Sequence, residues 1–315
     1  MTKQRIGLVL VPGFEVMSLA PLTVFEAANR RLDESRYDVA VLSEGGTPVP
    51  SSFGMTVTTL PLDSGHFDTI LVASNMALSP PTPGVKAFLQ DAAKTTRRIG
   101  SICVGAFTLG EAGLIDGRSA TTHWKFTREL QKRFPRAKVE VDQIFTEDDN
   151  IWTSAGQTAG TDMALGMVER DVGRDVARLV AKALVVEHRR PGGQSQHSVL
   201  LDLEPKSDAV QDALTYARHN LQSKLTIEAL ARAASLSPRQ FTRIFRAQTG
   251  QTPAKAIESL RLEAARLMTE QSSLTIATIA DETGFGDPER MRRAFLRALG
   301  HSPQALRRLA RSSAG

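Results

Sequence analysis

The sequence predicts an α/β domain built on a parallel sheet, followed by a smaller all-α domain. Three observations predict this division of the 315 residues. Apolar runs alternate with amphipathic stretches over residues 1–188, a segment that opens with Arg-Arg-Pro-Gly-Gly follows at 189–206, and residues 207–315 contain an internal repeat with no strand pattern. Alternation of strands and helices is typical of a parallel sheet covered on both faces.

Five short apolar runs predict the strands of the first domain. They are residues 6–11, 37–42, 69–73, 98–103 and 151–154. Their nearly uninterrupted apolar character favours parallel strands, because such strands are buried on both faces. Amphipathic stretches predict the covering helices at 22–31, 85–93, 162–169 and 176–188. A proline followed by two glycines does not continue a helix, so residues 189–206 are predicted to be a linker.

Composition and charge limit the class of protein. The single cysteine, Cys103, excludes an intrachain disulfide and fits a reducing cytoplasm. No apolar stretch approaches the roughly 18 residues that cross a bilayer, so we expect a soluble, cytoplasmic protein with no membrane partner. Residues 207–315 hold 16 basic and 10 acidic side chains, whereas the first 206 hold 23 and 24. The positive excess therefore lies in the last third, as expected if that part contacts a polyanion.

The internal repeat is the most informative feature of the sequence. Five residues recur 49 positions later: Thr226, Ile227, Leu230, Ala231 and Leu236 correspond to Thr275, Ile276, Ile279, Ala280 and Phe285. After a one-residue insertion the offset is 50, and Pro238, Phe241, Arg243, Phe245, Gly250 and Pro253 correspond to Pro288, Met291, Arg293, Phe295, Gly300 and Pro303. A repeated helical unit of this length predicts two copies of one supersecondary structure.

Each copy has the parts of a helix-turn-helix unit. A first helix at 227–233 or 276–283 is followed by a tight turn at 235–237 or 284–286. The second helix begins with an N-cap and a proline, and it ends at a glycine, which is the residue that a left-handed C-cap favours. These residues are Ser237, Pro238 and Gly250 in the first copy and Asp287, Pro288 and Gly300 in the second.

The outward faces of the two second helices are candidate DNA-binding surfaces. They carry Arg239, Gln240, Thr242, Arg243 and Arg246 in the first copy, and Glu289, Arg290, Arg292, Arg293 and Arg297 in the second. Arginine bonds guanine or phosphate and glutamine bonds adenine. Two such helices about 34 Å apart would enter successive major grooves. The alternative, that arginines coat an ordinary helical domain, is disfavoured because caps and glycine stops recur in register.

The repeat resembles the AraC/XylS-type regulators over residues 207–311, through the segments 235–250, 261–266 and 284–295. The resemblance implies sequence-specific binding to double-stranded promoter DNA, a long helix at 253–270 that joins the units, and a homodimer. It also implies contact with RNA polymerase if the protein activates a catabolic or metabolic operon, towards which the family leans. The sequence departs from the family at Ala256 and Leu306, where tyrosine is common.

The segment 99–107 has the form of a nucleophile elbow, because a strand ends at Cys103 and Gly105 opens a helix. A thiol at a helix N-terminus favours the thiolate. With segments 109–118, 121–124 and 152–162, the elbow resembles the PfpI/ThiJ superfamily, related to class I glutamine amidotransferases. The resemblance implies a flavodoxin-like parallel sheet that senses a ligand and dimerises. The combination of both domains is similar to GlxA-type regulators.

Three departures favour a binding pocket over an active site. Val104 replaces the histidine of hydrolytic relatives, Ser18 replaces an acidic residue, and Ala-Ser-Asn at 73–75 replaces a glycine pair. We therefore assign no catalytic residue, and His123 is more simply a packing or ligand-binding residue than a base. The candidate ligand-pocket residues are Ser18, Asn75, Cys103, Val104, His123, Ser154 and Thr158. The six scattered histidines predict no metal site, and no cofactor is expected.

Two other functions stay open from the sequence. One is a cysteine-dependent amidase or hydratase that uses Cys103, with the second domain as an accessory. The other is a nucleoid-type protein that binds DNA without sequence preference. The favoured hypothesis is a regulator in which a small metabolite binds over the carboxyl edge of the sheet and alters operator affinity, because ligands bind at that edge in doubly wound sheets.

Overall fold

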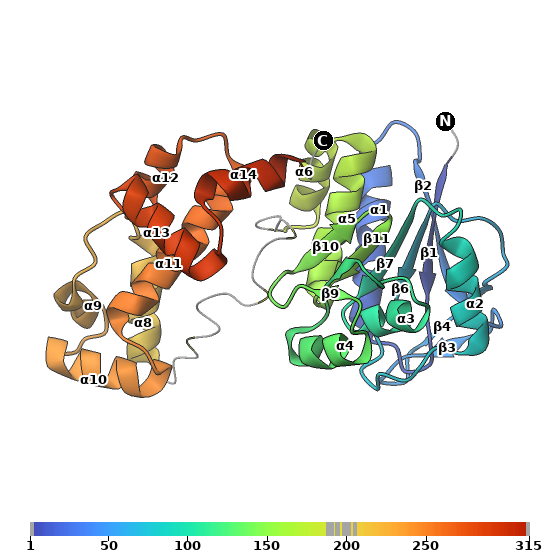
Figure 1. Cartoon of the computed structure of the whole chain (residues 1–315), viewed down its shortest axis with the longest axis horizontal. Helices are drawn as coiled ribbons and strands as arrows, with labels where there is room; N and C mark the ends of the chain where they lie inside the picture. The colour runs from blue at the N-terminus through green and yellow to red at the C-terminus, as the bar shows by residue number, and fades with distance from the viewer. Residues whose placement is uncertain (1–2, 187–191, 193–195, 197–202, 204–206, 313–315) are drawn as a thin grey trace. The chain divides into compact units, whose positions relative to one another are not determined.

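The computed structural model describes residues 3–186, 192, 196, 203 and 207–312. The chain divides into two compact units, Met1–Gln196 and His197–Gly315 (Figure 1). The first is an α/β unit and the second is all-helical, which confirms the predicted fold class. Of the predicted linker 189–206, three residues are described and the rest lie outside the described residues.

The first unit is built on a seven-stranded sheet with the order β10-β11-β7-β6-β1-β2-β5. Its strands are β1 (Gln4–Val9), β2 (Tyr37–Ser43), β5 (Leu60–Pro61), β6 (Thr69–Val72), β7 (Arg98–Ile102), β10 (Phe145–Asp148) and β11 (Ile151–Ser154). All neighbours pair in parallel except β10, which pairs antiparallel to β11. Every residue of β6, β7 and β11 is buried, which explains the largely apolar sequences of these strands.

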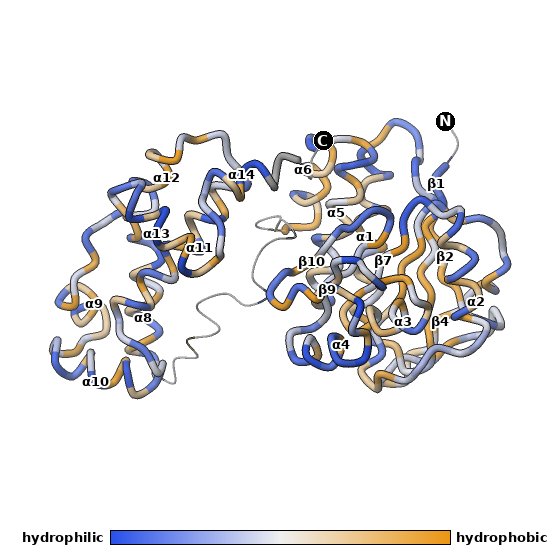
Figure 2. The backbone as a smooth tube through the Cα atoms, viewed as in Figure 1, coloured by the Kyte–Doolittle hydropathy of each residue, from blue (hydrophilic) through white to orange (hydrophobic). Residues whose placement is uncertain are grey.

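Helices cover both faces of this sheet. One face packs against α1 (Ala20–Asn29) and α5 (Gln157–Val172), with α6 (Arg174–Ala183) packed on these two helices. The other face carries α2 (Pro83–Ala92) and α3 (Gly105–Glu111), as Figure 1 shows. The sheet between them is the apolar interior seen in orange in Figure 2. Short elements complete the unit: η1 (Val16–Leu19), β3 (Val49–Pro50), β4 (Thr56–Val57), β8 (Ser119–Ala120), η2 (Trp124–Phe126), α4 (Thr127–Arg133) and β9 (Lys138–Val139).

The direction of the strand order changes between β1 and β6. From β1 the chain runs to β2 on one side, and it then crosses to β6 and β7 on the other side. The loops after β1, β6 and β7 therefore meet at the carboxyl edge of the sheet, where the order of the strands reverses. Cys103 directly follows β7 at this edge.

The second unit contains α8 (Asp208–His219), α9 (Ile227–Ala233), α10 (Pro238–Thr249), α11 (Pro253–Gln271), α12 (Ile276–Glu282), α13 (Pro288–Leu299) and α14 (Pro303–Ser312). It has two small apolar cores, one around Phe241 and Phe245 and one around Met291 and Phe295. The long helix α11 contributes to both, with Leu260 in the first and Ala265 in the second (Figure 1).

The two departures from the AraC/XylS pattern are accommodated in these cores. Ala256 is fully buried in the first core, and Leu306 packs against the second. Leu203, from the predicted linker, is also buried in the first core. In the described part of the chain, no helix is long and apolar enough to span a bilayer.

Candidate DNA-binding and effector sites

The first recognition helix, α10, is fixed at both ends by its own sequence. The hydroxyl of Ser237 accepts a hydrogen bond from the N–H of Gln240, and the side-chain oxygen of Gln240 accepts one from the N–H of Ser237 at 3.2 Å. This capping box, with Pro238 at the first helical position, satisfies N–H groups that a helix start leaves open. Gly250 ends the helix in the left-handed conformation at φ 72°. The cap also engages the Gln240 side-chain oxygen, one of the two groups that would bond adenine.

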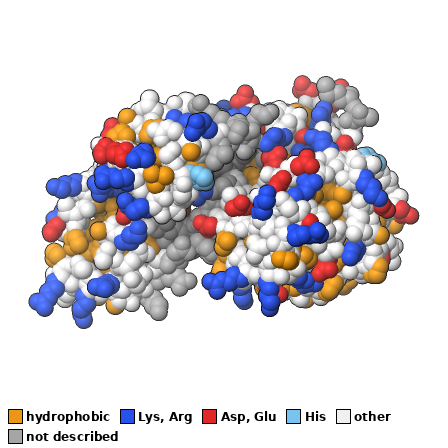
Figure 3. All heavy atoms as spheres, viewed as in Figure 1, with side chains coloured by type: hydrophobic (Ala, Val, Ile, Leu, Met, Phe, Trp, Pro, Cys, Tyr) orange, Lys and Arg blue, Asp and Glu red, His pale blue; other side chains and the backbone are white. Residues whose placement is uncertain are grey.

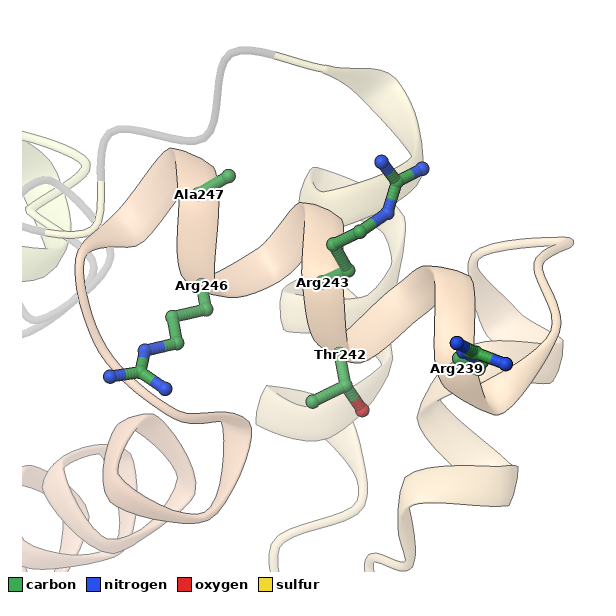
Figure 4. A pocket seen from close by; sticks show the side chains of 5 residues that line it. All are labelled: Arg239, Thr242, Arg243, Arg246 and Ala247. Atoms are coloured by element: carbon green, nitrogen blue, oxygen red, sulfur yellow. The ribbon is translucent and has the colours of Figure 1, made fainter.

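The outer face of α10 is cationic and open. Phe241 and Phe245 are buried in the core on the inner side of the helix. On the outer side an open concave surface, shown in Figure 4, is lined by Arg239, Thr242, Arg243, Arg246 and Ala247. The three arginines are exposed and form no ion pair with a described residue, and the helix contains no acidic residue. Thr242 is half-buried and donates its hydroxyl hydrogen to the carbonyl of Pro238 at 2.9 Å.

The second recognition helix, α13, has the same frame. The Asp287 carboxylate accepts hydrogen bonds from the N–H groups of Glu289 and Arg290, at 3.0 and 3.1 Å. Gly300 ends the helix at φ 70°. The predicted contact residues are again on the outside: Glu289, Arg290, Arg293 and Arg297 are exposed, and Arg292 is half-buried. Many Lys and Arg side chains lie on the visible face of the helical unit in Figure 3.

Two of the four α13 arginines are held in ion pairs. Arg292 donates two hydrogen bonds of 2.7 Å to the carboxylate of Glu289. Arg297 pairs with Glu258 of α11 at 2.5 Å. The hydrogen bonds from Arg292 hold the pKa of Glu289 below its usual range. The pKa of Glu258 is also lowered, because its partial burial is outweighed by the bond from Arg297 and by nearby positive charge.

Contacts across α11 hold the two halves of the unit together. Arg261 of α11 donates hydrogen bonds to the carbonyls of Leu221, at 3.3 and 3.1 Å, and Ser223, at 3.0 Å. The turn of the second copy closely approaches the carbonyl of Leu221: a Cβ added to Gly284 would lie 1.8 Å from this oxygen. The turn therefore requires glycine at this position, for this contact and for its φ of 73°.

The elbow of the α/β unit has the strained geometry that its sequence predicts. Cys103 lies between β7 and α3 with φ 55°, a left-handed value that is uncommon for a residue with a side chain. A Cβ on Gly105 would lie 2.7 Å from the carbonyl oxygen of Val72, so this position must be glycine. Backbone strain of this kind persists where the surrounding structure enforces it, often at functional sites.

Burial acts against ionisation of the thiol at this elbow. Cys103 is 2% exposed. Burial raises the pKa of the thiol, while the Ser74 hydroxyl and the Val104 N–H lower it in part, and the Glu15 carboxylate raises it further. The expectation that the helix N-terminus would favour the thiolate is therefore wrong, because desolvation outweighs it.

Buried hydroxyl groups surround the elbow. The Ser18 hydroxyl accepts a hydrogen bond from the N–H of Ser74 at 3.0 Å, and both residues are fully buried. The Ser74 hydroxyl has no hydrogen-bonding oxygen or nitrogen partner among the described residues. On the neighbouring strand, buried Ser154 donates to the carbonyl of Ser101 at 3.1 Å. Polar groups thus line the carboxyl edge of the sheet near the thiol.

Two of the remaining predicted pocket residues, Asn75 and His123, form local hydrogen bonds to the backbone. The Asn75 side chain donates to the carbonyl of Pro12 at 2.8 Å and is half-buried. His123 is half-buried, and its Nδ1 accepts from the N–H of Lys125 at 3.3 Å. Thr158 is exposed on the first turn of α5. Ser18, Cys103 and Val104 are therefore brought together at the elbow through Ser74, and Ser154 lies on the neighbouring strand, whereas the described hydrogen bonds of Asn75 and His123 join Pro12 and Lys125.

Comparisons with known proteins agree with both halves of the structure. The DJ-1/PfpI family model matches residues 4–170, and a helix-turn-helix domain model matches residues 230–309. The HTH-type transcriptional regulator GlxA of Rhizobium meliloti (strain 1021) is 33% identical over 97% of this chain and 96% of its own length. The chain belongs to the GlxA-type transcriptional regulators.

This GlxA-type regulator therefore joins a DJ-1/PfpI domain to a DNA-binding helix-turn-helix domain. A crystal structure of an AraC family transcriptional regulator from Pseudomonas putida shares the fold of its first unit, with a TM-score of 0.52 and 24% identity over 57% of this chain and 99% of that one. Isonitrile hydratase of Pseudomonas putida is 34% identical over 42% of this chain and 59% of its own length.

Sequence reasoning missed two residues that surround the thiol. The sequence pattern includes Ser74 only as part of a replaced glycine pair, although its hydroxyl lies against Cys103. The pattern does not include Glu15, although its carboxylate acts on the thiol and its N–H donates to the carbonyl of Ser74 at 3.0 Å. An acidic residue four positions after the apolar run of β1 was an available signal for Glu15.

Proposed function

We propose that this GlxA-type regulator binds a small polar effector at the Cys103 elbow, and that occupancy of the site alters its affinity for operator DNA. One observation carries the proposal: the strained elbow is kept, but the thiol on it is buried and its pKa is raised. A protein that needs the shape of the elbow without an ionised nucleophile uses it to bind. The buried hydroxyl of Ser74 supplies a hydrogen-bonding group for the effector.

Coupling to the second unit runs through the strand edge beside the elbow. The Thr122 hydroxyl donates to the carbonyl of Cys103 at 3.0 Å. The side-chain amide of Gln196, the last residue of the first unit, donates to the carbonyl of Thr122 at 2.9 Å and to that of Gln143 at 3.2 Å. An effector that shifts the Cys103 peptide therefore acts on the point at which the chain leaves this unit.

A binding experiment tests the effector site. The full chain is screened by thermal shift against a panel of amino acids and small carboxylic acids, and compounds that raise the melting temperature are tested by calorimetry. A compound of the proposed class binds wild type, binds Ser74→Ala at least tenfold more weakly, and changes DNA affinity in fluorescence anisotropy. Ser35→Ala is the matched control, because Ser35 is an exposed serine in the loop before β2, at the opposite edge of the sheet from the elbow. Equal binding to wild type and Ser74→Ala would refute the site.

The rival function is a cysteine hydrolase or hydratase, and the partial similarity to isonitrile hydratase is its support. We infer no turnover, because the pKa of the thiol is raised and Val104 stands where hydrolytic relatives have histidine. Nucleophilic catalysis requires an activated nucleophile with a base in reach. A turnover assay with isonitrile and amide substrates decides the question: a rate lost in Cys103→Ala would establish the enzyme.

We further propose that the protein acts in the cytoplasm as a homodimer on two operator half-sites, and that it contacts RNA polymerase as an activator. The DNA contacts are assigned to Arg239, Arg243 and Arg246 on α10 and to Arg290 and Arg293 on α13. Their support is exposure together with the absence of an ion pair to any described residue. Analytical ultracentrifugation and a footprint of the bound promoter test the assembly. A monomer protecting a single continuous site would contradict it.

A further inference from the structure

The two recognition helices differ at the positions that face outward. The residues that line the concave surface of α10 correspond, at an offset of 50, to five positions on α13. These are Glu289, Arg292, Arg293, Leu296 and Arg297. Four of the five positions differ, and at two of them an arginine of α10 is lost: a carboxylate, Glu289, corresponds to Arg239, and an apolar side chain, Leu296, corresponds to Arg246.

Leu296 is not explained by packing. Met291 and Phe295 of the same helix are fully buried in the second core, and Leu299 packs against that core. Leu296 is 40% exposed and belongs to no described apolar cluster. It follows Arg293 by three residues and Glu289 by seven, so the three side chains form one stripe along the outer face.

The length of this stripe fits the DNA groove. Seven residues of α-helix span about 10 Å, and the major groove of B-DNA is about 12 Å wide. The apolar group that the major groove presents is the C5-methyl of thymine, whereas the other base edges present hydrogen-bond donors and acceptors. A leucine held among polar side chains on a helix that enters the groove therefore matches thymine.

We propose that Leu296 is a specificity-determining residue that contacts the C5-methyl group of a thymine, so that α13 and α10 recognise DNA by different chemistry. This inference rests on the assignment of α13 to the major groove made above. On α10 the corresponding position is Arg246, which offers a charge to phosphate or guanine. The half of the operator bound by α13 therefore contains a required thymine that the half bound by α10 lacks.

Replacement of thymine by deoxyuridine provides a direct test, because the two bases differ in the methyl group alone. The full chain first selects duplexes from a randomised library, and each thymine of the selected site is then replaced singly by deoxyuridine. Loss of one buried methyl contact is expected to weaken wild-type binding about fourfold at one position. Leu296→Ala should bind both duplexes equally, and Leu296→Met should restore part of the preference.

Leu274→Ala is the matched control, because Leu274 is 39% exposed and lies outside both recognition helices. It should keep the wild-type response to deoxyuridine. The proposal is overturned if Leu296→Ala selects the same sequences with wild-type affinity, or if it responds to deoxyuridine as strongly as wild type does. A general loss of DNA binding from Arg293→Ala, with the deoxyuridine response intact in Leu296→Ala, would refute the leucine contact while leaving the placement of α13 in the groove unaffected.

Discussion

The two helix-turn-helix units share a frame and differ in how they present charge. Both recognition helices begin at a capped proline and end at a left-handed glycine. On α10 the arginines are exposed without an acidic neighbour on the helix, whereas on α13 Glu289 and Glu258 each hold an arginine. The frame is therefore set by caps and core residues that recur in the sequence, whereas most of the exposed positions assigned above to DNA contact differ between the copies. The turns differ too, since Gly284 of the second copy corresponds to Ser235 of the first.

The largest expected effect is the loss of stability caused by a substitution in the turn of the second helix-turn-helix copy. Gly284→Ala places a Cβ against the Leu221 carbonyl and imposes a side chain at φ 73°. We expect the free energy of unfolding to fall by about 3 kcal/mol, measured by urea denaturation of the full chain. Gly286→Ala is the control, because Gly286 also has a left-handed φ, 67°, but a Cβ added there would meet no atom within 4 Å. This substitution should lower the free energy of unfolding by about 1 kcal/mol. Equal losses would show that the contact with Leu221 is unimportant.

The next effect compares matched arginines of the two helices. Arg243→Ala should weaken operator binding by about 1–3 kcal/mol and relax selection at one position if the guanidinium bonds a base. Arg293→Ala, its counterpart on α13, tests whether both helices bind at once. Anisotropy with selected and scrambled duplexes at several salt concentrations provides the measurement. An equal loss on every sequence would assign the arginine to phosphate, and no loss from Arg293→Ala would remove α13 from the interface.

Neutralising Glu289, the acidic partner on α13, should raise the affinity for DNA, and by less than the arginine substitutions lower it. Glu289→Gln releases Arg292 and removes a negative charge from the face of α13 that is proposed to bind DNA. Affinity for non-specific duplex should rise about threefold to fivefold, with a steeper dependence on salt. Glu228→Gln removes an exposed carboxylate on α9 instead and should change little. If Glu289→Gln weakens binding to the selected duplex, then the carboxylate itself accepts a hydrogen bond from a base.

The smallest effect is expected where the first turn departs from the second. Ser235 adopts φ 54°, a left-handed conformation that is energetically unfavourable for any residue with a side chain. Ser235→Gly removes this strain, but it also gives the unfolded chain more conformational entropy, which opposes folding. The two effects partly cancel, so the free energy of unfolding should rise by about 0.5 kcal/mol. Urea denaturation monitored by circular dichroism measures the change. A fall would mean that the serine side chain has a role of its own.

Much of the fold was predictable because local chemistry decides it. The five central strands are largely apolar runs, and the ends of the recognition helices follow from Ser-Pro, Asp-Pro and glycine. The edge strands β5 (Leu60–Pro61) and β10 (Phe145–Asp148) were missed, since they are short or polar. The two-residue turn between β10 and β11, with Asp149 at φ 55°, was a usable signal.

Less of the candidate sites could be predicted, because long-range contacts determine them. Nothing near Arg297 in the sequence reveals Glu258, which lies 39 residues away. The pKa of Cys103 depends on burial and on side chains from two other loops. The exposure of Leu296 depends on the packing of Met291, Phe295 and Leu299, which fill the second core without it.

The inward position of Phe241 and Phe245, with the arginines of α10 outward, has a consequence for how such regulators diversify. Because the aromatic residues support the helix and the arginines do not, substitution on one side leaves folding almost unaffected. A duplicated ancestor could therefore acquire new promoter preferences one outward residue at a time. Each change would be neutral for assembly of the domain, and selection would act on the choice of target gene alone.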